Sequence, residues 1–327
     1  MMPETKRWGN MKTEDKPLIT VVTITYCKFE KIYDCILSVL NQDYPNIEYI
    51  ISDDGSSNFE QEKIEKYIGE NKKSNLKDLY ILTHEQNVGT VKNINGAYRK
   101  AHGEYIINVS GDDAFASNDV ISKIVNKINT YKPEVMGVSR VAVDEKGREM
   151  YYMPHASYVK KLSSFDREKQ FKKYVSGQFY AMFSGSALVY SKQFMEKMNY
   201  FDEQYRLWED GPFVARTLEI TRITPAYDIV GIRYSTGGVS GSNTNTLLLR
   251  DVERYNRTTR RENAHKLGVF YKALTLFNIK DCGLDYRERL TYAVMIIPIV
   301  VYKLIYKMSY LITEKKDIAN LRKGERH

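Results

Sequence analysis

Three pairs of neighbouring acidic residues could do chemistry together. Asp53–Asp54 and Asp112–Asp113 each close an apolar run, and Glu209–Asp210 stands about a hundred residues further along the chain. In an open α/β sheet, ligands bind outside the carboxyl ends of the strands, so the first two pairs are expected to face one crevice. Carboxylates gathered there can hold a hard divalent cation, and that cation can hold a diphosphate.

The elements that must position these residues alternate along the first two-thirds of the chain. Four buried strands are expected, at residues 18–26, 47–52, 77–83 and 104–110. The segments between them carry apolar residues at helical spacing; Gly103 is placed to end one helix and Ser117 to cap the next. This order predicts an α/β fold with a mostly parallel mixed sheet flanked by helices.

After Pro133 the pattern changes. We expect a hairpin over 138–153, a strand over 184–190, helices over 191–199 and 212–220, and a glycine-containing loop over 237–241. The resulting division is a flexible tail (1–16), a catalytic α/β domain (17–245) and a basic, amphipathic helical region (246–327).

Composition favours a folded protein of the cytoplasm. Hydrophobic residues make up 43% and charged residues 28% of the 327 residues, as expected for a globular chain. The three cysteines (Cys27, Cys35 and Cys282) have no metal-ligand spacing and no even pairing, which fits a reducing compartment. The polar, charged N-terminus has no apolar segment typical of a signal peptide.

The net charge of +8 belongs to the C-terminal quarter. Residues 250–327 hold 17 Lys and Arg against 9 Asp and Glu, whereas residues 1–249 hold 32 of each. A basic region on a neutral body indicates attraction to an anionic surface, either membrane or nucleic acid. No nucleic-acid-reading motif is present, and the apolar run in this region favours lipid.

The most apolar stretch is 290–312. Its longest uncharged run, 290–302, is shorter than the roughly 20 residues that cross a bilayer, and Pro298 interrupts it. One helical face carries apolar residues and another carries Lys303 and Lys307, as in a helix lying in a membrane interface. A helix packed on the catalytic domain and a re-entrant membrane segment remain alternatives.

Seven short motifs occur in an order that resembles the family 2 glycosyltransferases. They are 19–26 (ITVVTITY), 52–56 (SDDGS), 87–89 (NVG), 103–106 (GEYI), 110–113 (SGDD), 201–203 (FDE) and 208–210 (WED). These are inverting, nucleotide-sugar-dependent enzymes of the GT-A fold. The resemblance covers roughly residues 17–245, and its force lies in the order, because any single piece is common at turns.

The resemblance implies a donor site at the ends of the first two strands. Tyr26 is placed to stack on the nucleobase, Asp54 would accept a hydrogen bond from a uracil N–H, and Thr25 offers a hydroxyl nearby. The alternative is an ordinary exposed turn at Asp53–Ser56. Gly238 and Ser240 belong to a loop that could close over the diphosphate, because glycine lets backbone N–H groups approach closely.

The resemblance also implies a metal. Asp113 matches the family's metal ligand, and Asp112 matches the residue that approaches the ribose or the metal's water shell. Oxygen ligands suit Mn²⁺ or Mg²⁺. The commoner family pattern has an acidic residue where this chain has Ser110, which leaves one carboxylate fewer. A helix-capping role for the pair is the alternative.

Asp210 matches the family's general base, with Glu209 beside it. A carboxylate within reach of the acceptor hydroxyl can take its proton, and a helix start would stabilise its anionic form. Capping that helix is the alternative role. Ser184–Ser186 resembles the acceptor-side wall, where small residues leave room for a sugar.

We therefore expect a metal-dependent inverting glycosyltransferase that uses a UDP-sugar and a saccharide or lipid-linked saccharide acceptor. It would lie on the inner face of the cell membrane, held by its C-terminal helices, without binding nucleic acid. A non-catalytic protein that binds sugar nucleotides and docks on the membrane is the main rival. A nucleotidyltransferase is disfavoured, because no glycine-rich phosphate loop follows the first strand.

Overall fold

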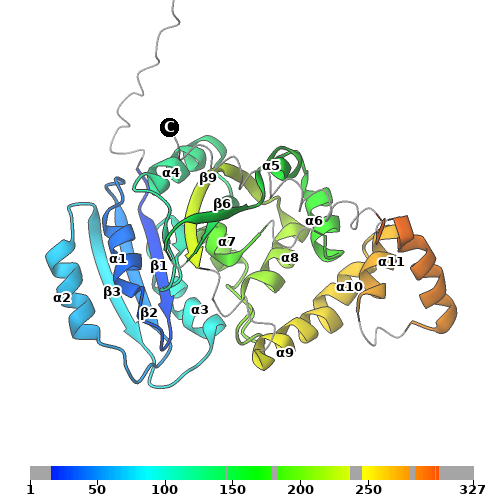
Figure 1. Ribbon diagram of the computed structural model, residues 1–327, viewed down its shortest axis with the longest axis horizontal. Coiled ribbons are helices and arrows are strands. Elements are labelled where there is room, and N and C mark those ends of the chain that lie inside the picture. Colours follow the sequence, from blue (N-terminus) through cyan, green and yellow to red (C-terminus); the bar gives the residue numbers. More distant parts are fainter. Residues whose placement is uncertain are drawn as a thin grey trace, which may run out of the picture.

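The computed structural model describes residues 16–144, 146–178, 183–235, 245–279, 284–298 and 300–301. Within these ranges, one nine-stranded sheet runs through the molecule and helices cover both of its faces (Figure 1). The strand order is β3-β2-β1-β4-β8-β6-β9-β5, and β7 pairs with the second half of β6. The predicted flexible tail and the loop with Gly238 and Ser240 lie outside the described residues.

The first half of the sheet is parallel, as predicted. Its strands are β1 (Ile19–Thr25), β2 (Ile47–Asp53), β3 (Leu76–Thr83) and β4 (Tyr105–Asn108). Its helices are α1 (Ile32–Leu40), α2 (Gln61–Asn71) and α3 (Thr90–Lys100). Nearly every residue of β1 and β2 is buried, because a parallel strand covered by helices on both sides has no solvent face.

The second half is mixed. Its strands are β5 (Ala114–Phe115), β6 (Val135–Val143), β7 (Glu149–Met153), β8 (Leu188–Ser191) and β9 (Thr224–Ser235). Its helices are α4 (Val120–Tyr131), α5 (Ala156–Ser163), α6 (Arg167–Val175), α7 (Lys192–Lys197) and α8 (Asp210–Ile220). β8 lies antiparallel between β4 and β6, and β6 and β7 form the predicted hairpin.

Each face of the sheet has its own hydrophobic core. One core joins α3, α7 and α8, and the other joins α1, α2 and α4. Tyrosines fill much of this space: Tyr44, Tyr49, Tyr98, Tyr190 and Tyr255 are among the largest fully buried side chains. The sequence left open whether its 26 tyrosines line a groove or fill a core, and these five are core residues.

Two local predictions were wrong. Gly103 does not end α3, whose C-cap is the extended residue Ala101. Gly103 is needed for a close approach instead, since a Cβ there would lie 2.5 Å from the backbone nitrogen of Thr20. Ser117 does not cap α4 either: its hydroxyl donates to Asp119, which is the N-cap residue.

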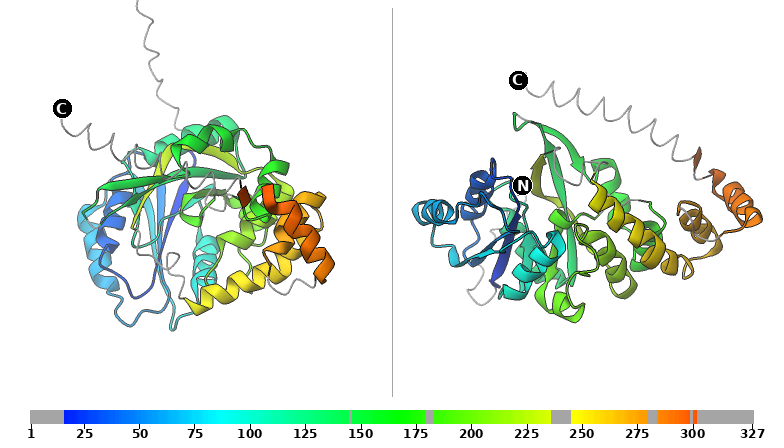
Figure 2. Two further views of the ribbon diagram at one scale, coloured as in Figure 1. Left: turned by 45° about the vertical axis from the view of Figure 1, so that its right-hand side comes forward. Right: turned by 90° about the horizontal axis from the view of Figure 1, so that it is seen from below.

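The C-terminal region is helical, as predicted, and extends away from the end of the molecule that carries α2 (Figures 1 and 2). It contains α9 (Thr246–Tyr255), a π-helical turn (Asn256–Arg260), α10 (Arg261–Ala264), α11 (Val269–Phe277) and helical residues 286–298. Asn245 caps α9 by accepting hydrogen bonds from the N–H groups of Leu247 and Leu248. None of the helices in the described ranges is long and apolar enough to cross a membrane.

Candidate functional site

The first two acidic pairs meet at the end of β1. Asp53 lies opposite Thr25 in the β1–β2 ladder, and the N–H of Asp54 donates to the carbonyl of Thr25 at 3.0 Å. On the other side of β1, the N–H of Gly111 donates to the carbonyl of Ile24 at 3.0 Å. The two acidic turns therefore flank one strand end, as the sequence predicted.

Asp53 and Asp54 point to different partners, although they are neighbours. Asp53 shapes its own turn, where its carboxylate accepts from the N–H of Ser56 at 2.7 Å and from its hydroxyl at 2.6 Å. That hydroxyl accepts in turn from the N–H of Cys27 at 2.8 Å. Gly55 has φ +75°, and a Cβ there would lie 2.5 Å from the carbonyl carbon of Gln86. The turn is thus specified by packing as well as by backbone conformation.

Asp54 holds the loop that leads into α3. Its carboxylate accepts from the side chain of Asn87 at 2.9 Å and from the N–H groups of Val88 and Gly89 at 2.7 and 3.0 Å. Burial raises the pKa of the Asp54 carboxyl, and the two amide hydrogen bonds oppose that shift. The sequence did not foresee this role for Asp54. Its contact with a nucleobase stays a prediction.

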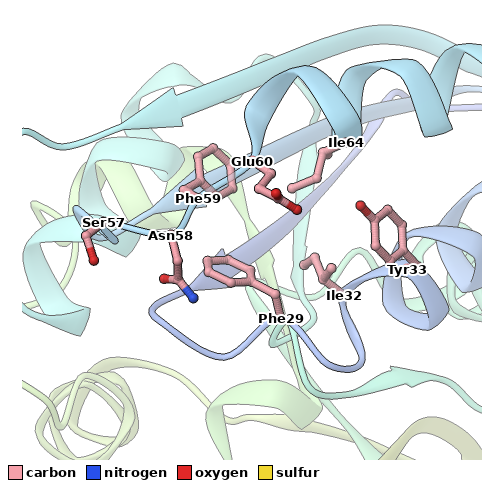
Figure 3. A pocket seen from close by; sticks show the side chains of 8 residues that line it. All are labelled: Phe29, Ile32, Tyr33, Ser57, Asn58, Phe59, Glu60 and Ile64. Carbon is pink, nitrogen blue, oxygen red and sulfur yellow. The ribbon is translucent and has the colours of Figure 1, made fainter.

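Tyr26 is available for stacking, because its side chain is 48% exposed just beyond β1. Thr25 is buried, and its hydroxyl lies 3.5 Å from the carbonyl of Lys28. The two loops that carry Tyr26 and Asp54 also enclose a pocket of about 490 Å³, which Figure 3 shows. Phe29 and Phe59 line it, with ring centroids 5.7 Å apart, whereas neither Tyr26 nor Asp54 does.

Asp112 and Asp113 lie half-buried in the turn between β4 and β5. The N–H of Asp113 closes this turn by donating to the carbonyl of Ser110 at 2.9 Å. Across the ladder from β5, Ala114 pairs with Arg233, so Asp113 adjoins the position of Tyr234 on β9. Among the described residues, no group of three or more His, Cys, Asp or Glu side chains could hold a metal ion by itself.

A pair of carboxylates nevertheless fits a metal that travels with a substrate. Mg²⁺ is commonly held by one or two protein carboxylates together with phosphate oxygens. Asp112 and Asp113 provide such oxygens at the edge of the sheet, beside the end of β1. They would hold Mn²⁺ or Mg²⁺ only together with a donor.

Asp210 is the first residue of α8. Its Oδ2 accepts a 2.7 Å hydrogen bond from the N–H of Gly185, in the turn before β8. The pKa of Asp210 is raised by burial, and the N–H of Gly185 and the charge of Arg140 oppose the rise most. Arg140 lies on β6, and its guanidinium is 4.5 Å from the ring centre of Tyr234 on β9. The positive charge that acts on Asp210 therefore also contacts the strand next to Asp113.

Glu209 behaves differently from its neighbour. Burial, and then the charge of Asp210, raise the pKa of Glu209 to about 8. Two interacting carboxylates titrate as a unit, and a pKa of about 8 keeps Glu209 protonated at neutral pH. At Asp210 the N–H groups of Gly185 and Gly211 favour the ionised form and oppose the effect of burial.

The small residue at position 185 has a specific structural reason. A Cβ on Gly185 would lie 2.7 Å from Oε1 of Glu209 and 3.4 Å from Cβ of Asp210. Glycine therefore admits the carboxyl pair, where the sequence suggested room for a sugar. Asn87 and Gly185 stand in motifs that did not indicate these roles, and Arg140 stands in none. Only the fold brings the three residues to the acidic pairs.

Comparisons with known proteins show the family and the fold. The model of Glycosyl transferase family 2 matches residues 20–197, more than half of the chain. The chain belongs to glycosyl transferase family 2. Beyond that, it is 36% identical over 110 residues to an uncharacterized glycosyltransferase of Haemophilus influenzae, a match that covers 34% of this chain and 42% of that protein.

A longer match reaches a relative with a named activity. The GalNAc(5)-diNAcBac-PP-undecaprenol beta-1,3-glucosyltransferase of Campylobacter jejuni is 24% identical over 212 residues, covering 63% of this chain and 65% of that protein. The chain thus spans less than two-thirds of the length of these curated relatives.

Solved structures share the fold. S. aureus TarS 1-349 in complex with UDP-GlcNAc superposes with a TM-score of 0.56 at 17% identity, covering 86% of this chain and 73% of that one. The mannosyltransferase PcManGT from Pyrobaculum calidifontis, in complex with GDP-Man and Mn²⁺, superposes with a TM-score of 0.53 at 14% identity, covering 90% and 80%. The predicted GT-A-type fold is confirmed.

Proposed function

We propose that this protein transfers a sugar from a UDP-sugar to a saccharide or lipid-linked saccharide, with inversion at the anomeric carbon, in surface-polysaccharide or glycan synthesis. The observation that carries the proposal is the Glu209–Asp210 pair. Asp210, the first residue of α8, accepts a 2.7 Å hydrogen bond from the N–H of Gly185 that favours its ionised form, and a raised pKa keeps its neighbour Glu209 protonated. A protein that only binds nucleotides has no need of such a base.

The reaction follows from these groups. The acceptor hydroxyl gives its proton to Oδ1 or Oδ2 of Asp210 and attacks the anomeric carbon from the side opposite the diphosphate. The bond between that carbon and the diphosphate oxygen breaks, so one displacement inverts the centre and releases UDP. Glu209 stays neutral, which spares the pair a second buried negative charge.

A divalent metal fits the donor side of this scheme. Asp113, with Asp112 beside it, would hold Mn²⁺ or Mg²⁺ against the diphosphate. Such an ion neutralises the charge that develops on the leaving group. Tyr26 would stack on the base, while Thr25 and the loop with Gly238 and Ser240 would approach the nucleotide.

An arginine-lined cavity supports an acceptor that carries phosphate. This surface cavity of about 550 Å³ is lined by two carboxylates, Asp251 and Glu253, and by four arginines: Arg206, Arg250, Arg254 and Arg257. Arg206 is three residues before Glu209, so the cavity adjoins the loop that leads to the proposed base. Guanidinium groups suit phosphate because they bind it bidentately. The diphosphate of a lipid-linked saccharide, or another glycosyl phosphate, has this chemistry.

The test is donor turnover. Purified protein is incubated with a panel of UDP-sugars and Mn²⁺, with and without saccharide acceptors, and released UDP is measured. We expect turnover with one donor, loss of most of it with EDTA, and a fall of at least about 100-fold in Asp210→Asn. Asp228→Asn is the matched control, because Asp228 is an exposed residue of β9 whose carboxylate pairs with Lys127. Donor binding without turnover on any acceptor would favour the non-catalytic rival.

We also propose that the C-terminal helices dock on an anionic membrane surface, with the protein on the cytoplasmic side. Tyr292 and Met295 pack against Ala273 and Leu274 of α11. The opposite face exposes apolar side chains at helical spacing: Leu290 (56%), Val294 (59%), Ile297 (55%) and Val301 (48%). The surplus of positive charge lies in the same region, so apolar burial and attraction to acidic lipids act together.

Vesicle flotation tests this docking. We expect the protein to float with vesicles that contain phosphatidylglycerol and to float less in Val294→Glu/Ile297→Glu. Tyr131→Glu is the control, since Tyr131 is 58% exposed on α4, in the catalytic part. Equal flotation of the double variant would place the membrane contact elsewhere.

A further inference from the structure

Asp251 on α9 gathers three consecutive backbone amides of a distant loop. Its side chain is 5% exposed, and its Oδ2 accepts from the N–H groups of Arg206 (2.9 Å), Leu207 (2.6 Å) and Trp208 (3.1 Å). Successive N–H groups that converge on one anion form a strong, directional site. A buried carboxylate is tolerated because these donors compensate for its lost hydration.

The loop that Asp251 holds runs directly into the proposed base. Trp208, its last residue, donates a side-chain hydrogen bond that helps to lower the pKa of Asp210. The Trp208 ring also packs edge-on against Tyr255, with ring centroids 5.2 Å apart. Asp251 and Tyr255 are one helical turn apart on α9, which lies below α8 in Figure 1, so this helix fixes the loop at two points.

The same loop reaches the donor side. The guanidinium of Arg206 donates to the side-chain oxygen of Asn87 at 2.6 Å, and the Asn87 amide donates to Asp54 at 2.9 Å. The carbonyl of Arg206 accepts from the N–H of Val91 in α3 at 3.1 Å. Asp251 is therefore connected to Asp54 through Arg206 and Asn87, and to Asp210 through Trp208.

We propose that Asp251 is a positioning residue that sets Asp210 relative to the donor side, which makes α9 a working part of the active site. This inference rests on the proposed transfer reaction. α9 lies beyond residues 20–197, the segment matched by the family model, so the family pattern gives no role to Asp251. Displacing a reacting group by about 1 Å can cost on the order of 100-fold in rate.

The two arms of the network predict different kinetic defects. Asp251→Asn keeps the shape and can place its carbonyl oxygen where Oδ2 lies, but it replaces charge-assisted hydrogen bonds from three N–H groups with weaker neutral ones. We expect kcat at saturating donor to fall by about 10- to 100-fold, because the base is misplaced. Arg206→Ala keeps the backbone contacts with Asp251 but removes the arm to Asn87 and one arginine of the cavity, so the KM values of the donor and of a phosphate-bearing acceptor should rise while kcat changes little.

Glu262→Gln is the matched control. It makes the same change in charge at an exposed carboxylate of α10, which lies outside the arginine-lined cavity. Its kinetics should equal those of the unaltered protein. Thermal unfolding of each variant, and UDP binding by titration, separate misplacement of the base from loss of the fold.

An active protein whose Asp251→Asn variant keeps kcat within twofold overturns the inference and leaves the proposed function standing. No UDP release from any donor by the unaltered protein overturns the function and this inference with it. If Asp251→Asn does not fold, Asp251→Glu and amide exchange decide. We then expect partial activity in Asp251→Glu and slow exchange at 206–208; exchange there as fast as in an exposed loop refutes the arrangement.

Discussion

The backbone N–H of Gly185 donates a 2.7 Å hydrogen bond to Asp210, a residue 25 positions later in the chain. This contact joins the turn before β8 to the start of α8. It opposes the rise that burial causes in the pKa of Asp210, whereas burial and the charge of Asp210 raise the pKa of Glu209 to about 8. The two adjacent acids therefore differ in the hydrogen-bond donors that they meet.

Gly185→Ala should damage activity more than stability. The added Cβ would meet the far end of the flexible Glu209 side chain, which can move at a cost of about 1 kcal/mol or less. The displaced carboxyl would then disturb Asp210, so we expect a fall in kcat of about 10-fold. Steady-state kinetics and thermal unfolding measure the two effects. Ser186→Ala in the same turn is the control, and equal activity of the two variants would contradict a role for Gly185.

The pH profile should show two events that belong to the carboxyl pair. Activity should fall in acid, as Asp210 takes up a proton, and change again near pH 8, where Glu209 ionises. Glu209→Gln mimics the protonated acid, so the acid limb should stay and the change near pH 8 should vanish. An event near pH 8 that survives in this variant must come from another group.

The same pair makes folding stability depend on pH. The pKa of Glu209 is raised on folding, so the folded state binds more protons than the unfolded state between about pH 4.3 and pH 8. Stability should therefore fall as pH rises through this window. Glu209→Gln should raise the melting temperature by about 2–6 °C at pH 9, and little at pH 4. A constant difference between the two proteins from pH 4 to pH 9 would contradict the assignment.

Replacement by alanine should change stability in opposite directions at two glycines, one at the N-cap of α3 and one inside that helix. Gly89 has φ +95°, and a Cβ there would lie 2.8 Å from the carbonyl oxygen of Arg206. Gly89→Ala should cost roughly 1–3 kcal/mol and weaken UDP binding through Asp54. Gly96 lies inside α3 with no neighbour within 4 Å of such a Cβ, so Gly96→Ala should stabilise by about 0.5–1 kcal/mol. Chemical unfolding and nucleotide titration check both.

The arginine-lined cavity should matter only for acceptors with phosphate. Arg250→Ala/Arg254→Ala should raise KM by roughly 10-fold, or about 1.4 kcal/mol, for a glycosyl phosphate or a lipid-linked saccharide. The same sugar without phosphate should be unaffected. A larger effect with the lipid-linked form than with the soluble phosphate would identify lipid as the source. Arg287→Ala is the control, because Arg287 is an exposed arginine outside the cavity.

The sequence predicted the sheet and the acidic turns because both are local features. Continuous β-branched runs such as Ile19–Thr25 specify buried strands, and the acidic turns end those runs. It did not predict the order of the second half of the sheet. There β8 comes to lie between β4 and β6, which depends on packing of segments far apart in the chain.

The site was predicted unevenly for the same reason. Asp54, Asp113 and Asp210 stand in motifs, so the sequence singled them out, but it did not predict the partners that hold Asp54 and Asp210. Asp251 reaches its loop from more than 40 residues away, and a lone Asp in a helix carries no signal in the sequence. Gly185 was noted as small, yet the reason for its size is the carboxyl pair that it admits.

The attachment of α9 to the catalytic loop limits how this protein can be recombined. A hybrid in which everything after residue 245 comes from another family member would lose Asp251, which anchors residues 206–208. This would happen even though the junction lies between the sheet and the C-terminal helices. Joining the two parents after Tyr255 instead would carry that anchor along. Exchange of C-terminal regions between such enzymes should therefore keep the loop anchored only when the chains are joined after α9.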